Sequence, residues 1–133
     1  MNTNTYARRS GDRGSTMVLS IFLILVVLLL ATALIEAGNA MAARGHGLDI
    51  AQQAARAGAD KIDLATLRGT GQVRIDPAAA EDAASAYLAQ LGETGTVTAT
   101  PASVVVTVTV NRPSISFGSI SVQVTASAAP LTG

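Results

Sequence analysis

The feature that most constrains this chain is an uncharged apolar run from Met17 to Ile35. As an α-helix rising about 1.5 Å per residue, the run is about 28 Å long, close to the roughly 30 Å of a bilayer's hydrocarbon core. Its hydroxyl side chains, Ser20 and Thr32, can donate hydrogen bonds to carbonyls of their own helix and need no other partner. The run therefore predicts a transmembrane helix, placed within residues 15–36.

Basic residues are concentrated before the apolar run. Three arginines, at positions 8, 9 and 13, are offset only by Asp12, whereas the first charged residue after the run is Glu36. Because basic residues favour the cytoplasmic side of a membrane helix, residues 1–14 are expected to form a cytoplasmic leader. The sequence thus predicts a single-pass protein of the cell membrane with residues 36–133 outside the cytoplasm.

Two kinds of processing fit the start of the chain. Ala40-Met41-Ala42 has small residues at signal-peptidase spacing, but the apolar run is longer than the about 7–15 residues of a usual signal peptide, which favours retention of the helix. Gly14 and Ser15 end a short basic leader directly before the run, where a prepilin-type peptidase would cut between them. The same two residues also fit a flexible glycine followed by Ser15 as a helix N-cap.

Residues 37–70 are expected to form a helical stem. Small or apolar residues recur three or four positions apart, which is one narrow stripe on a helix. The stripe consists of Leu48, Ala51, Ala55, Gly58, Ile62 and Ala65. Glycines predict a bend between Arg44 and Gly47, and Gly69-Thr70-Gly71 is expected to end the helix.

Residues 71–133 are expected to form a small α+β domain that begins with a second helix. Asp76 is a good N-cap, Pro77 suits the first helical position, and Gly92 is a natural stop. The apolar face of this helix consists of Ala80, Ala84, Tyr87, Leu88 and Leu91.

After the second helix the hydrophobic period becomes two, which predicts three strands of an antiparallel sheet covered by helices on one face. The strands are expected at residues 96–100, 104–110 and 120–128. Asn111-Arg112-Pro113 is expected to end the middle strand, and residues 114–119 to form a loop or a kinked edge piece. Phe117 in that segment is expected to be buried, with presentation to a partner as the alternative. The predicted fold is thus pilin-like: a transmembrane helix continues into an amphipathic helix that packs, with a second helix, on a small sheet.

The residues that carry chemistry form no recognisable constellation. His46 is the only histidine and cysteine is absent, so thiolate metal sites and disulfides are excluded and a metal site lacks partners. Nine basic and nine acidic residues balance, which gives no indication of a nucleic-acid partner. We therefore expect no enzyme activity and no catalytic, cofactor-binding or metal-binding residues. The carboxylates expected on solvated helix faces are Asp49, Asp60, Asp63, Glu81 and Asp82.

The order of several short motifs resembles TadE/TadG-like proteins of the tight-adherence (Flp-type) pilus system, in the form found in GC-rich actinobacteria. The motifs are Asp12-Arg13-Gly14, Ile35-Glu36-Ala37-Gly38, Ala42-Ala43-Arg44, Gln52-Gln53-Ala54-Ala55-Arg56-Ala57, Gly71 to Ala80, Ala86-Tyr87-Leu88, and the segments Val104 to Val110 and Ile120 to Ala128. The resemblance covers nearly the whole chain and depends on the order of these motifs.

The resemblance implies a minor pilin or pseudopilin that is cut after Gly14 by a prepilin peptidase, so that the mature chain begins at Ser15. Its partners would be other pilin-like subunits, pilus assembly proteins and membrane lipid. Leu19 stands where better-studied family members carry a glutamate that registers one subunit against the next. This departure leaves open a role as an assembly factor or initiating subunit that stays in the membrane.

Two other functions fit the sequence. One is a membrane-tethered or secreted binding or adhesion module with no role in a pilus, whose sheet binds an external ligand. The other is an accessory subunit that regulates a membrane enzyme or transporter.

Overall fold

The computed structural model describes residues 12–115 and 118–131. Its elements are α1 (Asp12–Ala59), α2 (Leu64–Thr70), α3 (Pro77–Gln90), β1 (Thr94–Ala99), β2 (Val104–Ser114) and β3 (Gly118–Ala128). The chain divides into two compact units, Met1–Glu36 and Ala37–Gly133, and α1 contributes residues to both. The predicted α+β class, with a long apolar N-terminal helix and a small antiparallel sheet, is confirmed.

In the first unit, the apolar run is helical and its large apolar side chains are exposed. The hydroxyl of Ser20 donates to the carbonyl of Thr16 at 2.8 Å. The hydroxyl of Thr32 donates to the carbonyl of Leu29 at 2.8 Å. The hydroxyls are thus satisfied within the helix, as expected from the sequence.

In the second unit, α1 continues through Arg44–Gly47 without a break, so the predicted bend is wrong. Gly47 instead lies against the sheet. A Cβ added there would lie 3.0 Å from Cγ2 of Val110 and 3.2 Å from Cγ2 of Val124. Glycine at this position permits close approach of helix and sheet, and the helical hydrogen bonds on either side keep the backbone regular.

The buried stripe of α1 agrees in part with the predicted one. Ala51, Ala55 and Gly58 are buried, but Leu48 is 37% exposed and Gly47 is buried in its place. The space between α1 and the buried valines of the sheet is so small that Gly47, and not Leu48, faces the sheet. The complete buried stripe consists of Ala43, Gly47, Ile50, Ala51, Ala54, Ala55, Gly58 and Ala59.

The stem helix ends earlier than predicted, at Ala59. The next residues pair with the segment before α3: the amide of Asp63 donates to the carbonyl of Arg74, and the amide of Asp76 donates to the carbonyl of Lys61, both at 2.8 Å. Ile62 and Ile75 form the bridge between these segments. Gly69-Thr70-Gly71 therefore ends the separate helix α2, where Gly71 has a φ of 72°.

Asp63 caps the N-terminus of α2 and is not simply a solvated carboxylate. Its Oδ1 accepts hydrogen bonds from the amides of Ala65 at 3.0 Å and Thr66 at 3.2 Å, and its Oδ2 accepts one from the Thr66 hydroxyl. These bonds, the one from the Thr66 hydroxyl first, hold the pKa of Asp63 below its usual value, and desolvation opposes them.

Acidification is expected to loosen α2. Because the pKa of Asp63 is lower in the folded chain, its contribution to stability is complete above the unfolded pKa and is lost as the pH falls through the folded value. Amide-exchange protection in α2, corrected for intrinsic exchange rates, should fall over that range. Asp63→Asn keeps a capping oxygen but does not titrate, and it should abolish the dependence. Equal pH dependence in both proteins would contradict this account.

Helix α3 begins as predicted, with Asp76 accepting hydrogen bonds from the amides of Ala78 and Ala79 and with Pro77 in its first turn. Gly92, with a φ of 69°, follows the helix closely. On the predicted apolar face, Ala80, Ala84 and Leu88 are buried and Tyr87 is half-buried. Leu91 is 47% exposed because it is the C-cap and not part of the helix.

The sheet is a three-stranded antiparallel meander in the order β1-β2-β3. The predicted alternation is confirmed in β2, where Val104, Val106, Val108 and Val110 are buried. The predicted end of this strand is wrong: β2 continues to Ser114, and Pro113 pairs in register with Ser119. Since β1 pairs with β2 only as far as Thr109, where Thr94 is the partner, no third strand needs an amide hydrogen from Pro113. Phe117 lies outside the described residues.

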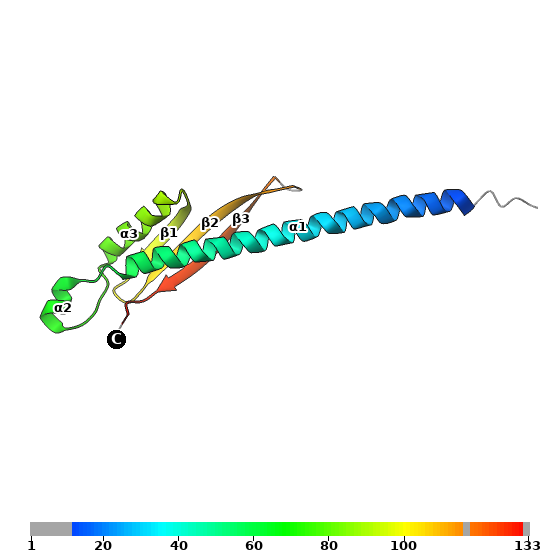
Figure 1. Cartoon of the computed structure of the whole chain (residues 1–133). Helices are drawn as coiled ribbons and strands as arrows, with labels where there is room; N and C mark the ends of the chain where they lie inside the picture. The colour runs from blue at the N-terminus through cyan, green and yellow to red at the C-terminus, as the bar shows by residue number, and fades with distance from the viewer. Residues whose placement is uncertain (1–11, 116–117, 132–133) are drawn as a thin grey trace, which may run out of the picture. The chain divides into compact units, whose positions relative to one another are not determined.

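The core of the second unit lies between one face of the sheet and the helices α1 and α3 (Figure 1). A Cβ on Gly58 of α1 would lie 3.1 Å from Cγ1 of Val104 and 3.0 Å from the carbonyl oxygen of Ala80 in α3. Tyr87 of α3 donates a hydrogen bond to the side chain of Gln53 of α1. The helices therefore contact each other as well as the sheet, and the opposite face of the sheet is left open.

Candidate membrane segment and assembly surfaces

The apolar part of α1 is the largest candidate functional surface. Within residues 12–115 and 118–131, α1 is the one helix long and apolar enough to cross a membrane. Its residues from Met17 to Ile35 carry no charge. Such a helix suits a membrane span or a signal anchor.

The candidate processing residues, Gly14 and Ser15, lie in the N-terminal part of α1 and are both exposed. No atom outside the local helix backbone lies within 4 Å of a Cβ added to Gly14. Ser15 is helical, because α1 already includes Asp12, so it is not the N-cap that one interpretation of the sequence required. Access to the Gly14–Ser15 bond is not blocked by packing within the described chain.

His46 lies near the carboxylate of Glu93. The distance from its Nε2 to Oε1 of Glu93 is 3.9 Å, which is too long for a hydrogen bond, and the His46 side chain is 50% exposed. No group of three or more potential metal ligands occurs in the part of the chain that the structure describes. His46 is thus a surface residue that loosely links α1 to the turn before β1.

Glu81 has a structural role that its sequence pattern did not indicate. Its Oε1 accepts a hydrogen bond from the amide of Ala99 at 3.1 Å, so it ties α3 to the end of β1. A glutamate early in a helix resembles any solvated carboxylate in a sequence, because its partner lies on a strand many residues later. Asp49, Asp60 and Asp82 are exposed, as expected.

The open face of the sheet is rich in hydroxyl groups and has no charged side chain among its described residues. Across the strands, Thr107 and Thr125 are joined by a hydrogen bond between their hydroxyls at 2.9 Å. By the strand register, this face consists of Thr94, Thr96, Thr98, Val105, Thr107, Thr109, Asn111, Pro113, Ser119, Ser121, Gln123, Thr125 and Ser127. A neutral polar face of this kind suits contact with another protein surface better than binding of an ionic ligand.

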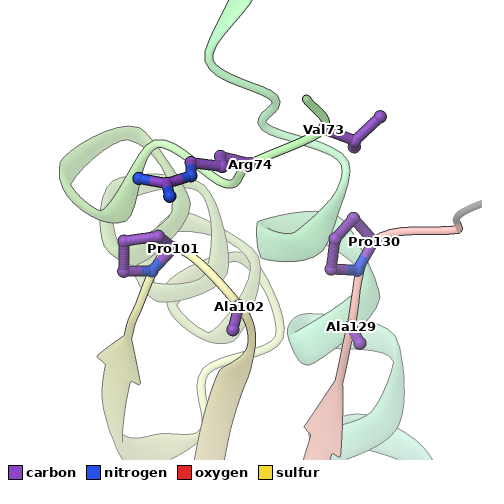
Figure 2. A pocket seen from close by; sticks show the side chains of 6 residues that line it. All are labelled: Val73, Arg74, Pro101, Ala102, Ala129 and Pro130. Carbon is purple, nitrogen blue, oxygen red and sulfur yellow. The ribbon is translucent and has the colours of Figure 1, made fainter. Parts of the chain in front are cut away.

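A shallow depression of about 560 Å³ lies where the β1–β2 turn and the chain after β3 meet the segment before α3 (Figure 2). In Figure 2 the guanidinium of Arg74 lies above Pro101, and Val73 lies above Pro130. The lining residues are Val73, Arg74, Pro101, Ala102, Ala129 and Pro130. With one cation and no carboxylate, imidazole or hydroxyl side chain, this lining offers no acid–base chemistry.

The described residues therefore present an apolar helix, a neutral open sheet face and a depression lined by one cation. These features suit membrane anchoring and protein packing. No family model, curated protein or solved structure matches this chain.

Proposed function

We propose that this chain is a minor pilin, pseudopilin or assembly subunit of a tight-adherence, type IV-like pilus or a related secretion system. The observation that carries the proposal is α1 itself. One helix has an uncharged apolar run in its N-terminal part and a stripe of alanine and glycine against a small sheet in its C-terminal part. The order of sequence motifs that resembles TadE/TadG-like proteins supports the same assignment.

In this proposal the apolar run holds the subunit in the membrane and residues 36–133 lie outside the cytoplasm. The subunit acts by binding other pilin-like subunits and assembly proteins, without a cofactor and without catalysis. The neutral open face of the sheet and the overall charge balance support contacts of this kind, since neither repels a second copy. Such a subunit would stay in the membrane or enter a surface pilus.

The proposal predicts that the chain purified from the membrane fraction begins at Ser15. Terminal sequencing or mass spectrometry of the intact chain measures this directly. Gly14→Leu should block the cut, because a bulky side chain replaces the glycine at the scissile bond. Gly38→Leu is the matched control: it also replaces an exposed glycine of α1 with open space around it, and it should leave the Ser15 start unchanged.

A chain that begins at Met1 in both the parent and the Gly38→Leu control, or a start near Met41, would contradict the pilin-like assignment. A soluble extracellular form that lacks Met17 to Ile35 would instead support a released binding module. Co-purification with a membrane enzyme or transporter, and not with the secretion ATPase or platform protein, would support the accessory-subunit alternative.

A further inference from the structure

The two edge strands of the sheet differ in how their free edges are protected. Strand β1 is short, and the amide of Ala99 at its end donates a hydrogen bond to Glu81. Strand β3 is eleven residues long, contains no charged residue and no proline, and pairs with β2 in an unbroken register. Among the described residues, no backbone hydrogen bond joins β3 to a segment other than β2. Charges, prolines, bulges and short strands are what usually prevent a free edge from pairing, and β3 has none of them.

The backbone groups on the free edge of β3 belong to alternate residues. In the β1–β2 turn, the amide of Thr100 donates to the carbonyl of Ser103 at 2.8 Å, and the strands follow in register from there. Residues of an antiparallel ladder direct their amide and carbonyl groups to the two neighbouring strands in turn, so Val104 bonds with Ala128 of β3. The residues of β3 whose amide and carbonyl groups point outward are therefore Ser119, Ser121, Gln123, Thr125 and Ser127.

The sequence of β3 is complementary to itself when two copies run antiparallel about Gln123. This residue is the middle one of β3, so all eleven residues pair and the outward backbone groups of the two copies meet. Large side chains then lie opposite small or equal ones on the core side, and hydroxyls lie opposite hydroxyls on the open face. The pairs are Ile120 with Ala126, Val122 with Val124, Ser119 with Ser127, Ser121 with Thr125, and Gln123 with its own copy.

The apolar side of β3 is incompletely covered within one chain. Val106 and Val108 of the central strand are fully buried, whereas Ile120 and Val122 of β3 are half-buried. A further strand beside β3 would cover both side chains. The five outward residues would exchange about ten backbone hydrogen bonds with such a strand, which is the number found in a typical specific interface. Since β3 is uncharged, a second copy meets no like charge.

We propose that the partner of this edge is a second copy of the chain. Two β3 strands pair antiparallel across a two-fold axis at Gln123 and join the two sheets into one. The buried faces and the hydroxyl-rich open faces then each continue across the junction. This inference goes beyond the proposed function and depends only on the second unit. It requires neither the membrane nor the cut between Gly14 and Ser15, so the two proposals can fail separately.

Charges at the two-fold axis test the pairing. Sedimentation of the full chain in detergent, at several concentrations, should show a dimer. Gln123→Lys and Gln123→Glu should each raise its dissociation constant several-fold, because like charges then lie directly opposite each other. An equimolar mixture of the two variants should restore the dimer, since lysine then faces glutamate. Thr96→Lys is the matched control: it adds the same charge at an exposed position on β1, and the dimer should be unchanged.

A spin label tests the register, because a cysteine introduced into this chain is the only one. In chains that sediment as dimers, a nitroxide on Gln123→Cys should show dipolar broadening, since Cβ atoms directly opposite each other lie about 4.5–5.5 Å apart. A nitroxide on Thr96→Cys should show none, because five strand spacings separate the two labels by at least about 24 Å.

A parent chain that stays monomeric would overturn this inference. A dimer that both Gln123 variants retain would also overturn it, as would a dimer whose label at position 123 is not broadened, because another surface would then hold the two copies together. None of these results would alter where the mature chain begins, which tests the proposed function.

Discussion

Two arginines placed at Leu25 and Leu29 are expected to release the chain from the membrane fraction. Both leucines are exposed on α1 near the middle of the apolar run. An arginine at the centre of a membrane helix costs roughly 2.5–3.5 kcal/mol on insertion scales, and each lost leucine removes a further fraction of a kilocalorie. The pair therefore opposes insertion by roughly 6–8 kcal/mol, which is comparable with the summed apolar contribution of the run.

The measurement is the fraction of the chain that resists extraction with alkaline carbonate. A matched control carries the same two charges with the same spacing, at Leu48 and Gln52, which are exposed residues of α1 outside the apolar run. The control should extract like the parent chain. If the Leu25→Arg, Leu29→Arg chain also resists extraction, the run is not what holds the protein in the membrane.

The second large effect is expected at Gly95, where alanine should destabilise the sheet domain by about 2–3 kcal/mol. Gly95 pairs with Val108 across β1 and β2. A Cβ at this position would lie 2.5 Å from the carbonyl oxygen of Thr107 and 3.0 Å from Cδ1 of Leu88. The closer atom belongs to the backbone of the central strand, so the added methyl group can be accommodated only if the two strands move apart. A domain of about a hundred residues has roughly 5–15 kcal/mol of stability in total.

Urea unfolding of the full chain in detergent, followed by circular dichroism, measures this effect. Gly45→Ala is the matched control, because it adds the same methyl group at an exposed helical glycine with nothing within 4 Å of the new Cβ. Alanine there should raise stability by about 0.5–1 kcal/mol, since it lowers the backbone entropy of the unfolded chain. Equal effects of the two substitutions would show that the approach at Gly95 is not as close as the structure has it.

The strand pattern was predictable because it depends on a period of two that any half-buried sheet imposes. Val104, Val106, Val108 and Val110 alternate with Val105, Thr107 and Thr109, and the period of two identifies the face that is buried. The end of β2 was not predictable from Pro113, because a proline is compatible with a strand wherever its missing hydrogen faces no partner. Whether a partner strand is present there depends on the length of β1, which only the tertiary structure decides.

The candidate surfaces likewise include some that the sequence predicts and one that it does not. The apolar run and the exposed Gly14–Ser15 bond are visible in the sequence, since hydropathy and local spacing define them. The cleft that joins Arg112 and Pro113 to Asn39 and Ala42 is not, because its two sides are some seventy residues apart in the chain. Only the antiparallel path of β2 along α1 brings them together.

By itself the sequence determined which segment is apolar enough to enter a membrane and which residues begin α3. It also determined which side of each strand is buried. These features depend on interactions within a few residues, whose energies are the same in any fold. The tertiary structure decided that Gly47 and not Leu48 faces the sheet, that α1 ends at Ala59, and that Glu81 bonds to the backbone of β1. Each of these depends on the distance between elements far apart in the chain, which packing alone sets.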